Sequence, residues 1–167
     1  MYSRIVIMGV AGCGKSSLGA ELARAEGIPL VEGDDFHSPE SRAKMAAGTA
    51  LTDADRAGWL AILGTQLQAH EGGIVLTCSA LKRAYREQLR AAAPGLRFVF
   101  MEIARDAAQA RVSARGAHFF NASLVASQFA TLEPPTGEPG VLTVDALQPI
   151  EVLRDQASAW LHERKAA

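Results

Sequence analysis

The chain has 167 residues, of which 49% are hydrophobic and 21% are charged, and its formal net charge is −1. This length and apolar content predict a single compact domain over 1–167 with a buried core. The near-neutral charge argues against a nucleic-acid partner, and no apolar run approaches the ~20 residues that cross a membrane. No secretory signal is visible, and Cys13 and Cys78 lack metal-ligand spacing, so we expect two reduced thiols in a cytoplasmic protein.

Short apolar runs alternate with helical patterns along the chain. The expected strands are 4–8, 28–32, 74–78, 96–103 and 141–144. The expected helices are 15–25, one that starts at Pro39, 52–70, 81–92, 106–115, 122–132 and 150–161, with a loop at 33–38. Apolar strands that alternate with helices indicate an α/β fold with three layers, in which helices cover both faces of a parallel sheet. Ligands of such sheets bind beyond the carboxyl ends of the strands.

The segment 9–16, Gly-Val-Ala-Gly-Cys-Gly-Lys-Ser, matches the P-loop pattern between an expected strand and an expected helix. Its glycines allow successive N–H groups to point at phosphate oxygens, and the helix adds its positive N-terminal end. We expect Lys15 to reach the β- and γ-phosphates of ATP and Ser16 to ligate Mg²⁺. The predicted phosphate-binding residues are Gly9, Val10, Ala11, Gly12, Cys13, Gly14, Lys15, Ser16 and Ser17.

A P-loop alone does not separate a kinase from a GTPase or a motor ATPase. The guanine signature Asn-Lys-x-Asp is absent, and Asn121 is the only asparagine. A motor ATPase is usually longer and has a strand that ends in an acidic residue, whereas the third expected strand leads into Thr77-Cys78-Ser79. These features favour a small-molecule kinase.

Acidic residues follow the second expected strand, in Glu32-Gly33-Asp34-Asp35-Phe36-His37. A carboxylate at this point can orient an acceptor hydroxyl and take its proton, and we predict Asp34 for this catalytic role. Asp35 is a candidate for Mg²⁺ binding through water or for contact with substrate hydroxyls. Glu32 is a candidate for a residue that hydrogen-bonds to the metal ligands without contacting the metal itself. His37 suits either substrate contact or a structural role. A turn without function is the alternative for the acidic pair.

Arg111 and Arg115 lie four residues apart and therefore share one helix face, just before Gly116. We expect a hinged lid over about 111–132 that brings both guanidinium groups to the transferring phosphate. Together with Lys15 and Asp34 they form the predicted catalytic set. A solvated helix face is the alternative for the two arginines.

Five stretches resemble the gluconokinase family of small, single-domain P-loop kinases. They are 8–16; Gly33-Asp34-Asp35-Phe36-His37 with Lys44-Met45 and Gly48; 51–60; 78–86; and the lid region with His118-Phe119 and 127–133. The resemblance implies ATP-dependent phosphorylation of D-gluconate to 6-phospho-D-gluconate. It also implies the fold of nucleoside monophosphate kinases, with a five-stranded parallel sheet in the order 2-3-1-4-5, and it makes a homodimer an expectation.

Gluconate is an open-chain polyol with one carboxylate, so its site needs a cation and several hydrogen-bonding groups. The candidate cations are Lys44, Arg56, Lys82 and Arg83, of which Arg56 and Arg83 lie in well-matched strings. The predicted substrate-binding residues are Asp34, His37, Lys44, Arg56, Ser79, Arg83 and Gln128. Ion pairs with Asp53, Asp55 or Glu87 are the structural alternative for the arginines, and Trp59 and Met45 are expected in the core.

The chain departs from the family pattern at Ser41-Arg42, Gly58 and Ala117, where the family usually has Asn with a small or apolar residue, Pro and Gly, respectively. Ser41 replaces only part of an amide's hydrogen-bonding capacity, so the accepted sugar acid could differ. Two other interpretations stay open. One is a kinase of the same fold for shikimate, another aldonate or a nucleoside monophosphate, and the other is a nucleotide-regulated binding module without turnover.

Overall fold

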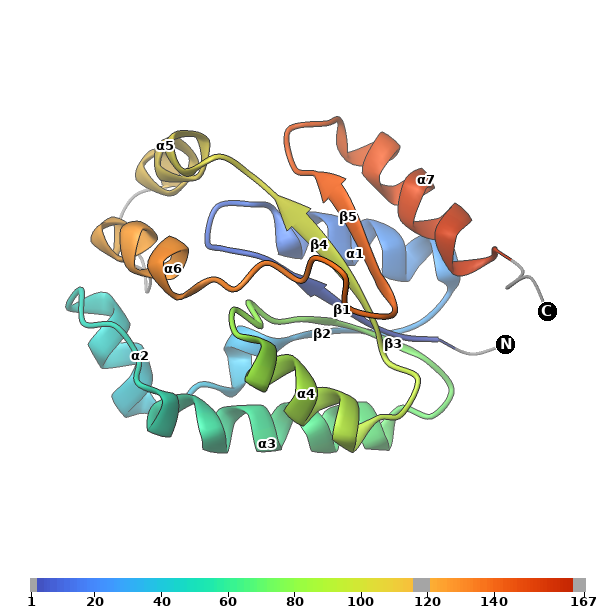
Figure 1. Ribbon diagram of the computed structural model, residues 1–167, viewed down its shortest axis with the longest axis horizontal. Coiled ribbons are helices and arrows are strands. Elements are labelled where there is room, and N and C mark those ends of the chain that lie inside the picture. Colours follow the sequence, from blue (N-terminus) through green and yellow to red (C-terminus); the bar gives the residue numbers. More distant parts are fainter. Residues whose placement is uncertain (1–2, 116–120, 164–167) are drawn as a thin grey trace.

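A computed structural model describes residues 3–115 and 121–163. Its sheet has five parallel strands in the order β2-β3-β1-β4-β5 (Figure 1), which confirms the predicted class and strand order. The strands are β1 (Arg4–Met8), β2 (Leu30–Glu32), β3 (Ile74–Thr77), β4 (Arg97–Glu102) and β5 (Val141–Asp145). Every residue of β3 is buried, as expected for a strand that is covered on both faces.

Helices cover both faces of this sheet. The pair α1 and α7 packs on one face, and the pair α3 and α4 packs on the other (Figure 1). The helices are α1 (Lys15–Glu26), α2 (Pro39–Ala46), α3 (Asp53–Ala69), α4 (Arg83–Ala92), α5 (Arg105–Arg115), α6 (Val125–Thr131) and α7 (Ile150–Leu161), with short 3₁₀ helices η1 (Gly33–Phe36) and η2 (Ala122–Leu124). In Figure 1, α2, α5 and α6 gather beyond the carboxyl ends of the strands.

The local signals for helix starts are confirmed. Thr52 caps α3 in a reciprocal capping box with Asp55, and Ser38 caps α2, in which Pro39 occupies the first turn. The loop expected at 33–38 is wrong in part, because Gly33–Phe36 forms η1. The helix expected at 122–132 is divided into η2 and α6. These short 3₁₀ turns lack the sustained periodicity that makes longer helices visible in a sequence.

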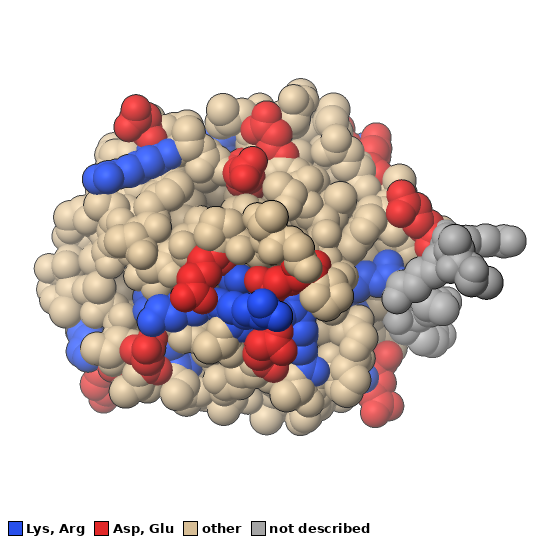
Figure 2. Space-filling model, viewed as in Figure 1, with Lys and Arg blue, Asp and Glu red and all other residues tan. Residues whose placement is uncertain are grey.

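A buried ion pair joins α4 to the segment before β5. Arg86 is fully buried and donates to both carboxylate oxygens of Glu138, at 3.0 and 2.6 Å, and to two backbone carbonyl oxygens. The face shown in Figure 2 carries basic and acidic side chains that are interleaved rather than gathered by sign. Among the described residues, no helix is both long enough and apolar enough to span a membrane.

Candidate active site

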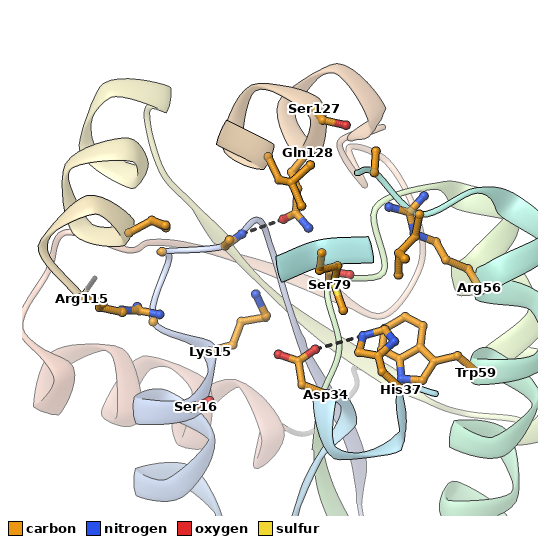
Figure 3. A pocket seen from close by; sticks show the side chains of 18 of the residues that line it. Lys15, Ser16, Asp34, His37, Arg56, Trp59, Ser79, Arg115, Ser127 and Gln128 are labelled. Atoms are coloured by element: carbon orange, nitrogen blue, oxygen red, sulfur yellow. Dashed lines mark hydrogen bonds and ion pairs between the residues drawn. The ribbon is translucent and has the colours of Figure 1, made fainter. Parts of the chain in front are cut away.

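A cavity of about 440 Å³ opens beyond the carboxyl ends of the strands. One wall is the loop between β1 and α1 together with the start of α1, and its lining residues are Ala11, Gly12, Gly14, Lys15, Ser16 and Ser17. The opposite wall comes from η1, α3 and the end of β3, with Asp34, His37, Arg56, Trp59 and Ser79. Figure 3 shows Lys15 and Asp34 facing one another across this space. The fold therefore places the predicted phosphate cradle opposite the predicted acceptor residues.

The P-loop backbone depends on glycine at two positions that face α5. Gly12 has φ +85°, and a Cβ on this residue would lie 2.7 Å from the carbonyl oxygen of Ala108. Gly14 has φ +100° and forms the N-cap of α1. Of the predicted phosphate-binding residues, Val10 and Cys13 are buried, and neither they nor Gly9 line the cavity. These three residues form the back of the loop rather than its surface.

Lys15 lies over its own loop. Its Nζ donates to the carbonyl oxygens of Gly9 at 3.0 Å and Val10 at 3.2 Å. These two contacts place the ammonium group at the mouth of the cradle, on the side that faces Asp34 (Figure 3). The arrangement puts a positive charge between the two walls of the cavity.

Asp34, which lies in η1, is oriented by His37, the residue that follows this short helix. Nε2 of His37 lies 3.4 Å from Oδ1 of Asp34, and the imidazole stacks on the Trp59 indole with centroids 4.2 Å apart. Partial burial opposes ionisation of Asp34, but the hydrogen bond from His37 and the charge of Lys15 hold its pKa below the usual value. Trp59 is anchored in turn, because its Nε1 donates to the carbonyl oxygen of Gly33 at 2.8 Å. The carboxylate is therefore ionised and oriented at neutral pH.

Arg56 is the cation that lines the acceptor wall. It is only 9% exposed, and its Nη1 donates to the Tyr85 hydroxyl at 3.2 Å. Tyr85 donates in turn to Asp53, which also pairs with Lys82. This chain of contacts fixes the guanidinium in the cavity wall.

The other candidate cations lie elsewhere. The Arg83 side chain is 66% exposed and comes no closer to a carboxylate than 3.9 Å, at Glu87. Lys44 pairs with Asp55 at 2.9 Å. Neither residue lines the cavity, and Asp35 is exposed outside it. The matched sequence strings did not separate Arg56 from Arg83, because both are arginines near helix starts.

The two lid arginines have different surroundings. Arg115 lines the cavity, and Figure 3 shows its guanidinium directed toward the phosphate cradle. Arg111 instead donates to the carbonyl oxygens of Gly12 and Cys13 at 3.2 Å each, and to that of Ala146 at 3.2 Å. It therefore ties the P-loop to the segment after β5. The remaining lid residues 116–120, including His118 and Phe119, lie outside the described residues.

Gln128 and Ser127 reach the cavity from α6. Oε1 of Gln128 accepts a hydrogen bond from the backbone N–H of Ala11 at 2.8 Å (Figure 3). Gln128 was predicted on the acceptor side, yet its amide oxygen contacts the P-loop. Ser127 was not predicted, although it adjoins Gln128 in the matched string.

Several apolar side chains complete the acceptor wall. Met45 and Trp59 are each 5% exposed, as expected for core residues, and both also line the cavity. Leu51 and Leu124, which were not singled out, join Met45 in a small separate apolar cluster. Only the tertiary fold brings these residues together, since they come from α2, the loop before α3 and η2.

Of the described departures from the family pattern, Ser41 and Gly58 do not line the cavity. Arg42 does contact the acceptor side, because its Nη2 donates to the backbone carbonyl oxygen of Asp34 at 2.9 Å. Ser41 is 5% exposed and is not part of the cavity wall, so the expected effect on acceptor choice has no contact to support it. Gly58 is exposed on α3 with open space around it, and Ala117 lies outside the described residues. Both cysteines are free and buried, and burial raises the pKa of the Cys78 thiol to about 12.

The sheet order and the cavity define a P-loop phosphotransferase, in which a lysine-bearing phosphate cradle faces a carboxylate that can accept a proton. A sequence profile of the AAA domain family matches residues 5–135. A gluconokinase from Gluconobacter oxydans (strain 621H) is 42% identical over 156 residues, which cover 91% of this chain and 87% of that protein.

Solved structures agree with the sequence comparison. A gluconokinase from Sinorhizobium meliloti 1021 superposes with a TM-score of 0.87 and 46% identity, over 95% of this chain and 91% of that chain. A sugar kinase from Janibacter sp. HTCC2649 gives a TM-score of 0.91 and 38% identity, over 96% and 95% of the two chains. The chain belongs to the gluconokinase family.

Proposed function

We propose that this protein transfers the γ-phosphoryl group of ATP to the 6-hydroxyl of D-gluconate, giving ADP and 6-phospho-D-gluconate. The observation that carries the proposal is the position of Arg56 and Asp34 on one wall of the cavity, opposite Lys15. An open-chain sugar acid has a carboxylate for the guanidinium and a terminal hydroxyl for the aspartate. Arg56 is nearly buried, so its charge-assisted hydrogen bonds are strong.

Asp34 is the proposed general base. The acceptor oxygen attacks the γ-phosphorus, the bond to the β-phosphate oxygen breaks with ADP as leaving group, and the hydroxyl proton passes to the carboxylate. Lys15 and Arg115 stabilise the charge on the transferring phosphoryl group. In this proposal Arg111 positions the P-loop through its contacts with the carbonyl oxygens of Gly12 and Cys13. Ser79 and His37 offer hydrogen bonds to the acceptor, and Gln128 belongs to the donor side through its contact with Ala11.

The donor set beside the P-loop fits Mg²⁺. Ser16 lines the cavity, and its Oγ donates to the Glu32 carboxylate at 3.0 Å. Oxygen ligands such as the Ser16 hydroxyl and the nucleotide phosphates are those that Mg²⁺ prefers, and the Glu32 carboxylate lies behind this hydroxyl. When bound with ATP, the cation would neutralise charge on the β- and γ-phosphates. We also propose a cytoplasmic location and a homodimer, and the mass of the protein in solution tests the latter.

A panel of acceptors in a coupled ADP-release assay tests the assignment. We expect ADP release with D-gluconate and much less with other aldonates, shikimate or nucleoside monophosphates. Release with shikimate or a nucleotide alone would move the protein to another kinase of the fold. ATP binding without acceptor-stimulated release would indicate a binding module. Lys15→Ala and Asp34→Ala should each remove most turnover and leave the protein folded, as judged by circular dichroism.

A further inference from the structure

The carboxylate of Glu32, the last residue of β2, receives hydrogen bonds from two hydroxyl groups. Ser16 Oγ donates to its Oε2 at 3.0 Å, and Thr77 Oγ1 donates to the same oxygen at 2.5 Å. Ser16 belongs to the start of α1, and Thr77 is the last residue of β3. One carboxylate oxygen therefore links the P-loop serine to the central part of the sheet.

The backbone around Glu32 keeps this arrangement in register. Glu32 pairs directly with Thr77 across the parallel strands β2 and β3. The next residue, Gly33, donates its N–H to Thr77 Oγ1 at 3.2 Å, and a Cβ at Gly33 would lie 2.1 Å from the Thr77 carbonyl oxygen. Only glycine permits this close approach of the two chains. Thr77 is 4% exposed, so its hydroxyl is held inside the protein.

The contact determines how Ser16 faces the cavity. A serine hydroxyl has one proton to donate, and that proton is directed to Glu32, so the oxygen lone pairs are left as acceptors. A carboxylate behind a metal ligand orients it and raises its basicity. Many P-loop enzymes have an acidic residue on another strand that helps to hold Mg²⁺. Here β3 ends in Thr77, which instead donates to the carboxylate at the end of β2.

We propose that Glu32 is the positioning residue of the divalent-cation site. It orients Ser16 through the Ser16–Glu32–Thr77 hydrogen-bond network and supplies the negative charge that the end of β3 lacks. The inference rests on the proposed use of Mg²⁺-ATP and is independent of the acceptor. The competing explanation is a purely structural link between β2 and α1, which would affect stability and leave metal affinity unchanged.

The test measures Mn²⁺ binding to the complex of the protein with ADP by electron paramagnetic resonance. Calorimetry of ADP binding with Mg²⁺ and with a chelator gives the metal-dependent part of nucleotide affinity. Glu32→Gln should weaken Mn²⁺ binding by about 10- to 100-fold, the usual effect of losing such a partner. ADP affinity in chelator should stay within about twofold of the wild type, because the phosphate cradle is unchanged. Glu40→Gln, an exposed glutamate on α2, is the matched control and should bind Mn²⁺ as the wild type does.

Two further variants keep the proposal testable if Glu32→Gln does not fold. Thr77→Val removes one donor to Glu32 and should weaken Mn²⁺ binding, while Thr77→Ser keeps the hydroxyl and should restore it. Wild-type Mn²⁺ affinity in Glu32→Gln or Thr77→Val, with a lower melting temperature, would overturn the proposal in favour of the structural link. Because no acceptor is present, failure of gluconate turnover would not change these results.

Discussion

Gln128 Oε1 accepts a hydrogen bond from the backbone N–H of Ala11 at 2.8 Å, so α6 contacts the phosphate cradle directly. Four residues earlier, Leu124 packs with Met45 and Leu51 on the acceptor side. Asn121 adds a second link there, since its backbone N–H donates to the Met45 carbonyl oxygen at 3.3 Å. The segment from η2 to α6 therefore touches both walls of the cavity.

Replacing Gln128 should weaken ATP binding. Gln128→Glu places a negative charge beside the P-loop, where it repels the phosphates of ATP. We expect this repulsion to raise the KM for ATP roughly tenfold or more. Gln128→Ala should have a smaller effect, because it removes a neutral hydrogen bond. Gln68→Ala, on the exposed face of α3, is the control. An unchanged KM for ATP in Gln128→Glu would contradict the assignment of Gln128 to the donor side.

Arg56 and Arg83 provide a matched pair for the acceptor carboxylate. Arg56→Ala removes a nearly buried guanidinium from the cavity wall, and we expect the KM for gluconate to rise about 10- to 100-fold. Arg83→Ala removes an exposed side chain outside the cavity and should change the KM by less than about twofold. Steady-state kinetics with ATP at saturation measures both. If Arg83→Ala raised the KM for gluconate more than Arg56→Ala did, Arg83 would be the residue that binds the gluconate carboxylate.

His37 should set the acid limit of activity through Asp34. The pKa of Asp34 lies below its usual value, so loss of activity through its protonation occurs only as the pH falls through that lowered value. His37→Phe keeps a ring that can stack on Trp59 but removes the hydrogen bond, while burial of the carboxyl remains. We therefore expect the acid limb of kcat/KM to move to higher pH. A pH profile with the wild-type limb in this variant would show that His37 does not act on Asp34.

Substitution of Arg115 and substitution of Arg111 should impair different properties of the protein, namely turnover in the first case and stability with nucleotide affinity in the second. Arg115→Ala removes a cavity-lining cation, and we expect kcat to fall by about 100-fold or more, as for other donors to a transferring phosphoryl group. Arg111→Ala removes three hydrogen bonds to backbone carbonyls and should lower the melting temperature as well as nucleotide affinity. Parallel kinetics and thermal unfolding separate the two. If both variants lost kcat equally and kept their stability, both guanidinium groups would instead contact the transferring phosphoryl group.

The Arg86–Glu138 pair should dominate the stability of the region around α4. Glu138→Gln leaves a fully buried guanidinium without its counter-charge, and we expect the free energy of unfolding to fall by about 3–5 kcal/mol. Glu87→Gln, an exposed partner of Arg90, should cost less than about 1 kcal/mol. Urea unfolding monitored by circular dichroism compares the variants.

The same pair should make stability pH-dependent. The hydrogen bond from Arg86 lowers the pKa of Glu138, so its stabilising contribution is complete above the usual glutamate pKa and is lost as the pH falls through the lowered value. The wild type should therefore lose more stability on acidification than Glu138→Gln does. Acid titrations of both proteins, followed by their unfolding, test this expectation. Equal losses of stability in the wild type and in Glu138→Gln would contradict this role of Glu138.

Much of the candidate site follows from local patterns. The P-loop and the acidic turn at 33–37 were visible because their residue types are demanded by short-range geometry and lie directly after apolar strands. Their position at one edge of the sheet followed from the parallel topology. The structure places Lys15 and Asp34 on facing walls of the cavity, which agrees with that reasoning. Their catalytic roles stay predictions.

The sequence by itself determined the class of this protein, since strand and helix periodicity, the P-loop and the family-like strings depend only on neighbouring residues. The tertiary structure decided which of two similar arginines lines the cavity, because α3 buries Arg56 and α4 leaves Arg83 at the surface. It also decided that Gln128 contacts Ala11 and that Glu32 contacts Ser16. Such contacts join residues far apart in the chain, and their direction depends on how the elements pack rather than on local sequence.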